Sequence, residues 1–295
     1  MARVAKLVYY PVKGCAGTSV ETADVTPAGL RFDRAWMVVS AEGEFRSQRK
    51  QPVMASIRAE VTDDGARLRL AAPGVEDLLV ETVTDGPQHP AATFTWQGKG
   101  VHQGDEAAEW FSGVLGLPSV FVGLTPEHER VTNGEIPGTA AFADAHAILL
   151  TSESSLAGLN ERIASRGAEA VPMDRFRPNI VVSGWPEPHR EDDVRSLTVG
   201  GVELGYAKVC IRCTVPMVDQ ETGEKAGPEP IRSLADYRRE PEGGVSFGIK
   251  MAVTGPGQMS VGDEVIVHSW AGPSPSTADA EPPFTATASR PAESV

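Results

Sequence analysis

Two of the three cysteines in the chain, Cys210 and Cys213, lie three positions apart in a stretch of β-favouring residues. A thioredoxin-like redox pair would open a helix, whose dipole lowers the pKa of the thiol, but Ile211 and Val215 favour extended chain here. A zinc site would need further ligands, and the histidines show no paired metal spacing. One thiolate could instead bind a soft transition metal whose other ligands come from a cofactor. Two small buried core residues are the structural alternative, which the pair by itself favours.

Basic residues follow or precede predicted strands near the start of the chain. Lys13 lies in a turn with Gly14 and Gly17, whose backbone amides a phosphate could approach closely. The alternative, which the loop alone favours, is an ordinary solvated lysine. Arg34 directly precedes the apolar run 35–39, so it is either a buried anion-binding guanidinium or part of a solvated turn.

The start of a predicted helix after residue 151 offers hydroxyl groups. Ser152 is placed as an N-cap residue and Ser155 lies in the first turn. A strand that feeds a serine-capped helix can point free backbone amides at an anion. The alternative, which an isolated match favours, is that these serines only cap their own helix.

An arginine and an asparagine flank a proline before the apolar run 180–182. Because a proline disfavours helical backbone in the residue before it, Pro178 predicts an extended Arg177. Arg177 and Asn179 could then present a guanidinium and an amide to the same ligand at the entrance of a strand.

The elements that would position these residues are mostly strands. A Gly-Gly pair at residues 200–201 predicts a hairpin whose second strand leads to the cysteines. The punctuated segment 125–140 predicts a boundary near residue 124. Beyond Trp270 the composition shifts to Pro, Ala, Ser, Thr and Glu, which predicts a disordered tail. We therefore expect an α+β, predominantly β protein with a few helices, organised as domains 1–123 and 124–270 and a tail, 271–295.

Composition excludes several classes of function. The formal net charge of −13 disfavours general binding to nucleic acid and to an anionic membrane surface. No apolar run approaches the length of a membrane span, and charges and Pro11 interrupt the first apolar run, unlike a signal peptide. Three sparse cysteines fit a reducing compartment, so a cytoplasmic location is predicted.

The motifs described above occur in a specific order along the chain, and others accompany them. They comprise Tyr10-Pro11-Val12-Lys13 with Gly17, Gly29-Leu30 through Trp36, Ser152 through Asn160, Phe176 through Val182, Cys210 through Cys213 with Val218-Asp219, and Val261-Gly262-Asp263. In this order and spacing the chain resembles the family built from a MOSC N-terminal β-barrel domain followed by a MOSC domain, as in the mitochondrial amidoxime-reducing component family. The resemblance implies a β-barrel-like first domain and a second, MOSC β-barrel domain.

The resemblance also implies roles for individual residues. In such relatives the cysteine at the position of Cys213 ligates molybdenum, whose other sulfur ligands come from a pyranopterin that carries a phosphate. Cys210 matches a frequent non-ligating cysteine, and Gly14 stands where many relatives have a serine, so backbone amides would have to replace one hydroxyl contact. The implied cofactor-binding residues are Lys13, Arg34, Ser152, Ser155, Arg177 and Asn179.

The implied activity is that of a molybdenum-cofactor-dependent oxidoreductase that reduces N-hydroxylated small molecules, namely amidoximes, hydroxylamines or N-hydroxylated bases. Pyridoxal phosphate is not expected. The chain after Trp270 has no cysteine to hold an iron–sulfur cluster, so electrons are expected from a separate ferredoxin, flavoprotein or cytochrome b5-like protein. The alternative function is a module that carries the molybdenum cofactor or transfers sulfur without its own turnover.

Overall fold

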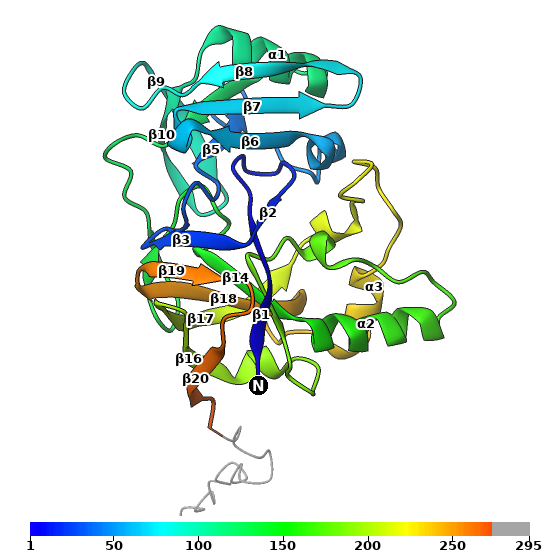
Figure 1. The fold of residues 1–295 in the computed structure, drawn as a ribbon. Helices are drawn as coiled ribbons and strands as arrows, with labels where there is room; N and C mark the ends of the chain where they lie inside the picture. Colours follow the sequence, from blue (N-terminus) through cyan, green and yellow to red (C-terminus); the bar gives the residue numbers. More distant parts are fainter. Residues whose placement is uncertain (273–295) are drawn as a thin grey trace, which may run out of the picture.

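The computed structural model describes residues 1–272 of the chain. Residues 273–295, most of the predicted tail, lie outside the described part. The described residues form many strands and three α-helices, so the predicted class, α+β and predominantly β, is confirmed. In Figure 1 the strands β6 to β10 and helix α1 occupy the upper part of the molecule, and strands β14 to β20 with helices α2 and α3 occupy the lower part.

The lower part is built on an eight-stranded sheet with the strand order β2-β1-β15-β14-β18-β17-β16-β20. Its neighbours are antiparallel except for β14 and β15, which are parallel and are joined through α2, as a parallel pair requires a crossover. The bounds are β1 Arg3–Tyr9, β2 Thr18–Val20, β14 Ile148–Ser152, β15 Ile180–Ser183, β16 Val194–Val199, β17 Val202–Arg212, β18 Val245–Gly255, β20 Val265–Trp270, α2 Glu153–Ser165 and α3 Ile231–Tyr237.

The hairpin predicted at the Gly-Gly pair is present between β16 and β17. Val199 pairs with Val202 across it, and Gly200 has a φ of 55°, which glycine adopts without the strain of a Cβ atom. Strand β17 then runs for eleven residues to Arg212 and pairs along its length with β18. Cys210 and Cys213 therefore lie at the far end of this hairpin, as the sequence predicts.

The upper part consists of two small sheets, packed with α1 around a second apolar core. One sheet has the order β6-β7-β8 and the other the order β5-β11-β10-β9. The bounds are β5 Trp36–Val39, β6 Arg58–Thr62, β7 Arg67–Ala72, β8 Val75–Glu81, β9 Gln88–Thr93, β10 Trp96–His102, β11 Val120–Gly123 and α1 Asp105–Leu115. Short 3-10 helices are η1 Pro52–Ser56, η2 Asp63–Gly65, η3 Met173–Phe176, η4 Arg190–Asp193 and η5 Val215–Met217.

Strands from both ends of the chain pair with one another. β1 joins the lower sheet through β15, with Leu7 opposite Ile180, and β3 (Thr22–Thr26) lies between β4 (Gly29–Leu30) and β19 (Gly257–Ser260). The predicted boundary near residue 124 follows β11, and the punctuated segment 125–140 contains the paired strands β12 (Val131–Thr132) and β13 (Gly138–Thr139). The division into domains stays a prediction, because the first 26 residues pair with strands of the second half.

Candidate functional site

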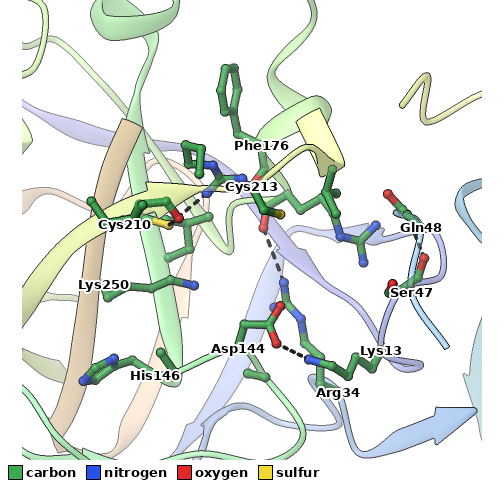
Figure 2. A pocket seen from close by; sticks show the side chains of 18 of the residues that line it. Lys13, Arg34, Ser47, Gln48, Asp144, His146, Phe176, Cys210, Cys213 and Lys250 are labelled. Carbon is green, nitrogen blue, oxygen red and sulfur yellow. Dashed lines mark hydrogen bonds and ion pairs between the residues drawn. The ribbon is translucent and has the colours of Figure 1, made fainter. Parts of the chain in front are cut away.

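A cavity of about 380 Å³ brings together most of the predicted site residues. Its lining comes from the first 49 residues and from the second half of the chain, and Figure 2 shows many of these side chains. The volume is typical of a site for a small molecule. The predicted residues in the lining are Lys13, Arg34, Arg177, Asn179 and Cys213, together with Cys210. Ser152 and Ser155 are not in it.

The two thiols of the Cys-x-x-Cys stretch differ in exposure. Cys210 is still within β17 and is 4% exposed, whereas Cys213 follows the strand and is exposed. The Sγ of Cys210 accepts a hydrogen bond from Nη1 of Arg212 at 3.0 Å. Burial would raise the pKa of Cys210, but the charges of Arg212 and Lys250 outweigh it and lower that pKa. Cys210 is therefore held by its neighbours, and Cys213 offers its thiol to the cavity.

The zinc interpretation of the cysteines requires additional protein ligands. Within residues 1–272, no group of three or more His, Cys, Asp or Glu side chains is arranged to hold a metal ion. Cys15, the third cysteine, is fully buried and belongs to the apolar core of the upper part.

Two arginines of the cavity lining lie over one tyrosine ring. The guanidinium carbons of Arg34 and Arg177 are each 4.2 Å from the centroid of the Tyr10 ring, a cation–π distance. The hydroxyl of Tyr10 donates to the carbonyl of Pro178 at 3.1 Å. Burial raises the pKa of Tyr10 to about 12 and lowers the pKa of Arg177 to about 10. We call Arg34, Tyr10 and Arg177 the arginine stack.

The arginine stack has one buried carboxylate for its two guanidinium groups. Arg34 donates to Oδ2 of Asp33 at 2.6 Å, and Oδ1 of Asp33 accepts from the backbone N–H of Tyr10 at 2.8 Å. Arg34 also donates to Oδ1 of Asn179 at 3.2 Å, while Nδ2 of Asn179 donates to the carbonyl of Val8 at 3.1 Å. The cavity lining at the arginine stack thus carries an excess of positive charge, which suits an anion.

The backbone of Arg177 is not extended, so that prediction is wrong. Arg177 has φ 56° and ψ 47°, the left-handed region, and its N–H donates to the carbonyl of Asp174 at 2.9 Å, which ends η3. The Arg177 side chain lies over the Tyr10 ring, and its Nη1 donates to Gln220 at 3.1 Å. These contacts accompany a backbone conformation that Pro178 disfavours in the residue before it. Arg34 also has a positive φ, 51°. Left-handed non-glycine residues are uncommon and cluster at functional sites.

Lys13 is buried, which excludes an ordinary solvated lysine. It is 5% exposed, and its Nζ donates to the carbonyl of Phe142 at 2.8 Å and to Oδ1 of Asp144 at 2.5 Å. Burial lowers the pKa of Lys13, and the Asp144 carboxylate opposes that shift. The side chain of Asp144 is 62% exposed. A ligand phosphate at Lys13 would therefore share the ammonium with Asp144.

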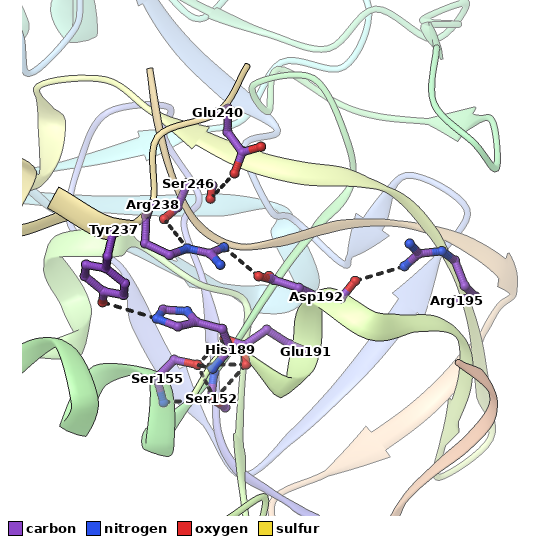
Figure 3. A network of polar contacts seen from close by, with 10 residues as sticks. All are labelled: Ser152, Ser155, His189, Glu191, Asp192, Arg195, Tyr237, Arg238, Glu240 and Ser246. Carbon is purple, nitrogen blue, oxygen red and sulfur yellow. Dashed lines mark hydrogen bonds and ion pairs between the residues drawn. The ribbon is translucent and has the colours of Figure 1, made fainter. Parts of the chain in front are cut away.

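The serines of the α2 N-terminus face a carboxylate of the chain itself (Figure 3). Ser152 caps α2 by accepting from the backbone N–H of Ser155, as predicted. The hydroxyl of Ser152 donates to Glu191 at 2.8 Å, and that of Ser155 donates to both oxygens of Glu191, at 2.7 and 2.8 Å. All three side chains are fully buried. The anion at this helix start is thus Glu191 of η4, and the two serines do not line the cavity. Their role in binding a cofactor stays a prediction.

Several polar residues of the cavity were not identified from the sequence, among them Gln48, Asp144 and Lys250. Gln48 donates to the carbonyl of Gly14 at 2.7 Å, and Asp144 pairs with Lys13. Both lie in irregular segments with no distinctive pattern. Lys250 lies in the middle of β18. The sequence could have indicated this residue, because a lysine within the apolar run 247–253 is unusual for a buried strand.

Comparisons with known proteins define the family of this chain. Residues 1–118 match the model of the MOSC N-terminal beta barrel domain, and residues 137–266 match that of the MOSC domain. The chain therefore belongs to the family of MOSC domain proteins with an N-terminal beta barrel domain, and the resemblance found in the sequence is confirmed.

Named relatives cover most of the chain. It is 34% identical over 282 residues to human mitochondrial amidoxime-reducing component 1, and 32% identical over 282 residues to bovine mitochondrial amidoxime reducing component 2. Each match covers 89% of this chain and 82% of the relative. A rice molybdenum cofactor sulfurase is 30% identical over 266 residues, which cover 82% of this chain and 31% of that protein.

Among the described residues, no helix has both the length and the apolar composition needed to cross a bilayer.

The first prediction concerns the buried serine–glutamate cluster. Ser155→Ala removes two hydrogen bonds to the buried Glu191 carboxylate, so the free energy of unfolding should fall by about 1–3 kcal/mol. Urea unfolding followed by circular dichroism measures this change. The matched control is Ser154→Ala, one residue away, whose hydroxyl donates to an exposed carbonyl and whose loss should cost about 0.5 kcal/mol or less. Equal effects of the two substitutions would contradict the assignment.

Proposed function

We propose that this chain is a molybdenum-cofactor-dependent oxidoreductase that reduces N-hydroxylated small molecules, such as amidoximes, hydroxylamines and N-hydroxylated bases. The observation that carries the proposal is one cavity with an exposed thiol, Cys213, and a buried cationic cluster, the arginine stack. Two of the relatives described above are named as amidoxime reducing components, which supports the reaction class.

The donor groups of the cavity fit the two chemical ends of this cofactor. A soft metal prefers thiolate ligands, and Cys213 presents the exposed thiol. A phosphate prefers fixed guanidinium groups, which Arg34 and Arg177 supply. When bound, the cofactor supplies the redox chemistry at its metal. Asn179 would act as a positioning residue, because its amide holds Arg34 and is itself fixed to β1.

Asp144 and Lys13 would form a polar pair within reach of a ligand in the cavity. The protein around the Asp144 carboxyl opposes its ionisation even though the side chain is open to the cavity, but the charge and the hydrogen bond of Lys13 outweigh this effect and lower the pKa of Asp144. Asp144 is thus a carboxylate at neutral pH, able to accept a hydrogen bond from the N–OH group of a substrate but not to donate a proton. The substrate proton source would be another group or water.

The proposal includes a separate electron donor, which would be a ferredoxin, a flavoprotein or a cytochrome b5-like protein. This partner is inferred from the reaction class, since a reductase must receive two electrons for each N–O bond that it cleaves. The cytoplasmic location likewise stays a prediction.

A second candidate function is a module that carries the molybdenum cofactor or transfers sulfur without turnover. The observation in its favour is the match to a rice molybdenum cofactor sulfurase, of which this chain covers 31%. Both functions use the same cavity. Steady reduction of an N-hydroxylated substrate distinguishes them, because a carrier would bind the cofactor without reducing the substrate.

The second prediction tests the role of Cys213. Protein purified from a cofactor-competent host should contain molybdenum and reduce benzamidoxime with a dye-linked electron donor. Cys213→Ala should lower this activity by about a hundredfold, because a metal ligand is lost. Cys210→Ala is the matched control and should change the activity by about threefold or less, because Cys210 is turned toward Arg212.

Three outcomes of this experiment decide against the reductase. Absence of molybdenum, or full activity of the Cys213→Ala protein, would overturn the proposal. Bound molybdenum without any turnover of the unaltered protein would favour the carrier function.

The third prediction tests the arginine stack as the phosphate end. Arg177→Gln removes a charge-assisted contact, so the molybdenum-to-protein ratio after dialysis should fall by about tenfold. Plasma emission spectrometry measures this ratio. Arg195→Gln is the matched control, because Arg195 also lies over a tyrosine, Tyr206, at 4.1 Å but does not line the cavity. An equal loss in the control would mean that the effect is one of stability.

A further inference from the structure

A second cavity lies in the upper part of the molecule, and the proposed function does not use it. Its volume is about 560 Å³, and its wall comes from the start of β5, the turn before β7, the end of β8 and the end of β11. It shares no lining residue with the cavity of Cys213 and the arginine stack. The larger apolar side chains of its wall are Phe32, Trp36, Val83 and Leu124. Its size and apolar lining are typical of a site for a small molecule.

Trp36 contributes a buried hydrogen-bond donor to the wall of this second cavity. The residue is 6% exposed, and its Nε1 has no hydrogen-bond partner within residues 1–272, whereas Nε1 of Trp110 donates to the carbonyl of Glu76 at 2.8 Å. The Nε1 atom of Trp36 is not fully occluded by protein atoms either. Buried indole N–H groups generally have a partner, so a ligand with an acceptor atom would complete this one.

Gly123 leaves the indole N–H of Trp36 uncovered. The two residues pair across β11 and β5, and both line the second cavity. A Cβ atom at position 123 would lie 3.1 Å from Nε1 of Trp36, so a side chain there would crowd the N–H edge of the ring. The N–H edge therefore lies beside a part of the cavity wall that carries no side chain.

Phe32 adds a second aromatic ring to the wall, and its backbone is strained. Its φ is 65°, which is rare for a bulky residue. The ring stacks with Trp36, with centroids 6.2 Å apart and an interplanar angle of 26°, and the guanidinium carbon of Arg31 lies 4.6 Å from its centroid. The two stacked rings offer a flat apolar surface of the kind that packs well against another aromatic ring.

The carboxylates at this cavity are already paired with cations of the chain. Asp64 pairs with Arg31 at 2.5 Å, and Glu81 pairs with Arg67 at 2.6 Å. A charged ligand would have to compete with these pairs, whereas an uncharged one would leave them intact. The ligand that fits the wall is therefore neutral, aromatic and able to accept one hydrogen bond.

We propose that the second cavity binds a neutral aromatic compound whose carbonyl oxygen accepts a hydrogen bond from Nε1 of Trp36. The aromatic part packs against Phe32, Val83 and Leu124. The site does not depend on the proposed function, because neither Cys213 nor the arginine stack takes part in it.

Nitrogen-15 NMR of the purified full-length chain tests the hydrogen bond directly. The chain has five tryptophans, so five indole N–H signals are expected. Addition of 2-acetonaphthone should move the indole proton of Trp36 downfield, because it gains a carbonyl acceptor, and should leave the other four in place. 2-Isopropenylnaphthalene has the same shape with C=CH₂ in place of C=O, and it should not cause this downfield shift.

A substitution that covers the cavity tests its location. Ala66 is an exposed residue of the wall, and an arginine there could reach the carboxylates of Asp64 and Glu81 across the opening. In Ala66→Arg the dissociation constant for 2-acetonaphthone should rise by about tenfold or more. Ala170→Arg is the matched control, because it adds the same side chain at an exposed alanine outside this wall, and it should change the constant by about twofold or less.

Four results would overturn the proposal. They are an unmoved Trp36 signal with 2-acetonaphthone, an equal downfield shift with 2-isopropenylnaphthalene, unchanged affinity of Ala66→Arg, and a Trp36 signal that moves with protein concentration alone. The last result would assign the cavity to a contact between copies of the chain. Absence of molybdenum or of turnover would overturn only the reductase, since these measurements require neither.

Discussion

The arginine stack is the contact on which the arrangement of the cavity depends. Tyr10 follows β1, Arg34 precedes β5, and Arg177 follows η3, so three segments distant in the sequence meet at one buried ring. Burying two guanidinium groups beside a single carboxylate, Asp33, is electrostatically unfavourable unless hydrogen bonds and a bound anion compensate. The hydrogen bonds to Asn179 and Gln220 supply part of this compensation, and an anion in the cavity would supply the rest.

A cofactor site of the proposed kind also requires that the thiol of Cys213 reach the same cavity. The hairpin at Gly200 directs β17 toward the stack, and pairing with β18 fixes its register as far as Arg212. Cys210 is consequently enclosed and Cys213, just beyond the strand, is free to face the cavity. Pairing of β1 with β15 holds the residues of both halves around this space. The sheet therefore brings the thiol and the arginine stack to one cavity.

Much of this arrangement could be predicted from the sequence, where local patterns carry the information. The Gly-Gly hairpin and the N-cap at Ser152 depend on neighbouring residues, and both are confirmed. Five predicted site residues also meet in one cavity, although in the sequence only their order and a family resemblance indicated that they act together. They are Lys13, Arg34, Arg177, Asn179 and Cys213. Apart from Arg177 and Asn179, these residues are far apart in sequence, so no local signal could show that they converge.

Predictions failed where tertiary contacts override local preference. Pro178 favours an extended residue before it, but the contacts of the Arg177 side chain with Tyr10 and Gln220 accompany a left-handed backbone. Ser152 and Ser155 have the pattern of an anion site, and they do meet an anion, but it is Glu191, which lies 36 positions beyond Ser155. Partners at such separations cannot be identified from a single sequence.

The central claim is that Cys213 ligates the metal of a cofactor whose phosphate is bound by the arginine stack. Molybdenum K-edge X-ray absorption of the purified protein, compared with Cys213→Ser, tests this claim most directly. The account predicts that the number of sulfur atoms bound to molybdenum is one lower in the variant, because the protein thiolate is replaced by a hydroxyl. An identical number of sulfur ligands in the two proteins would contradict it.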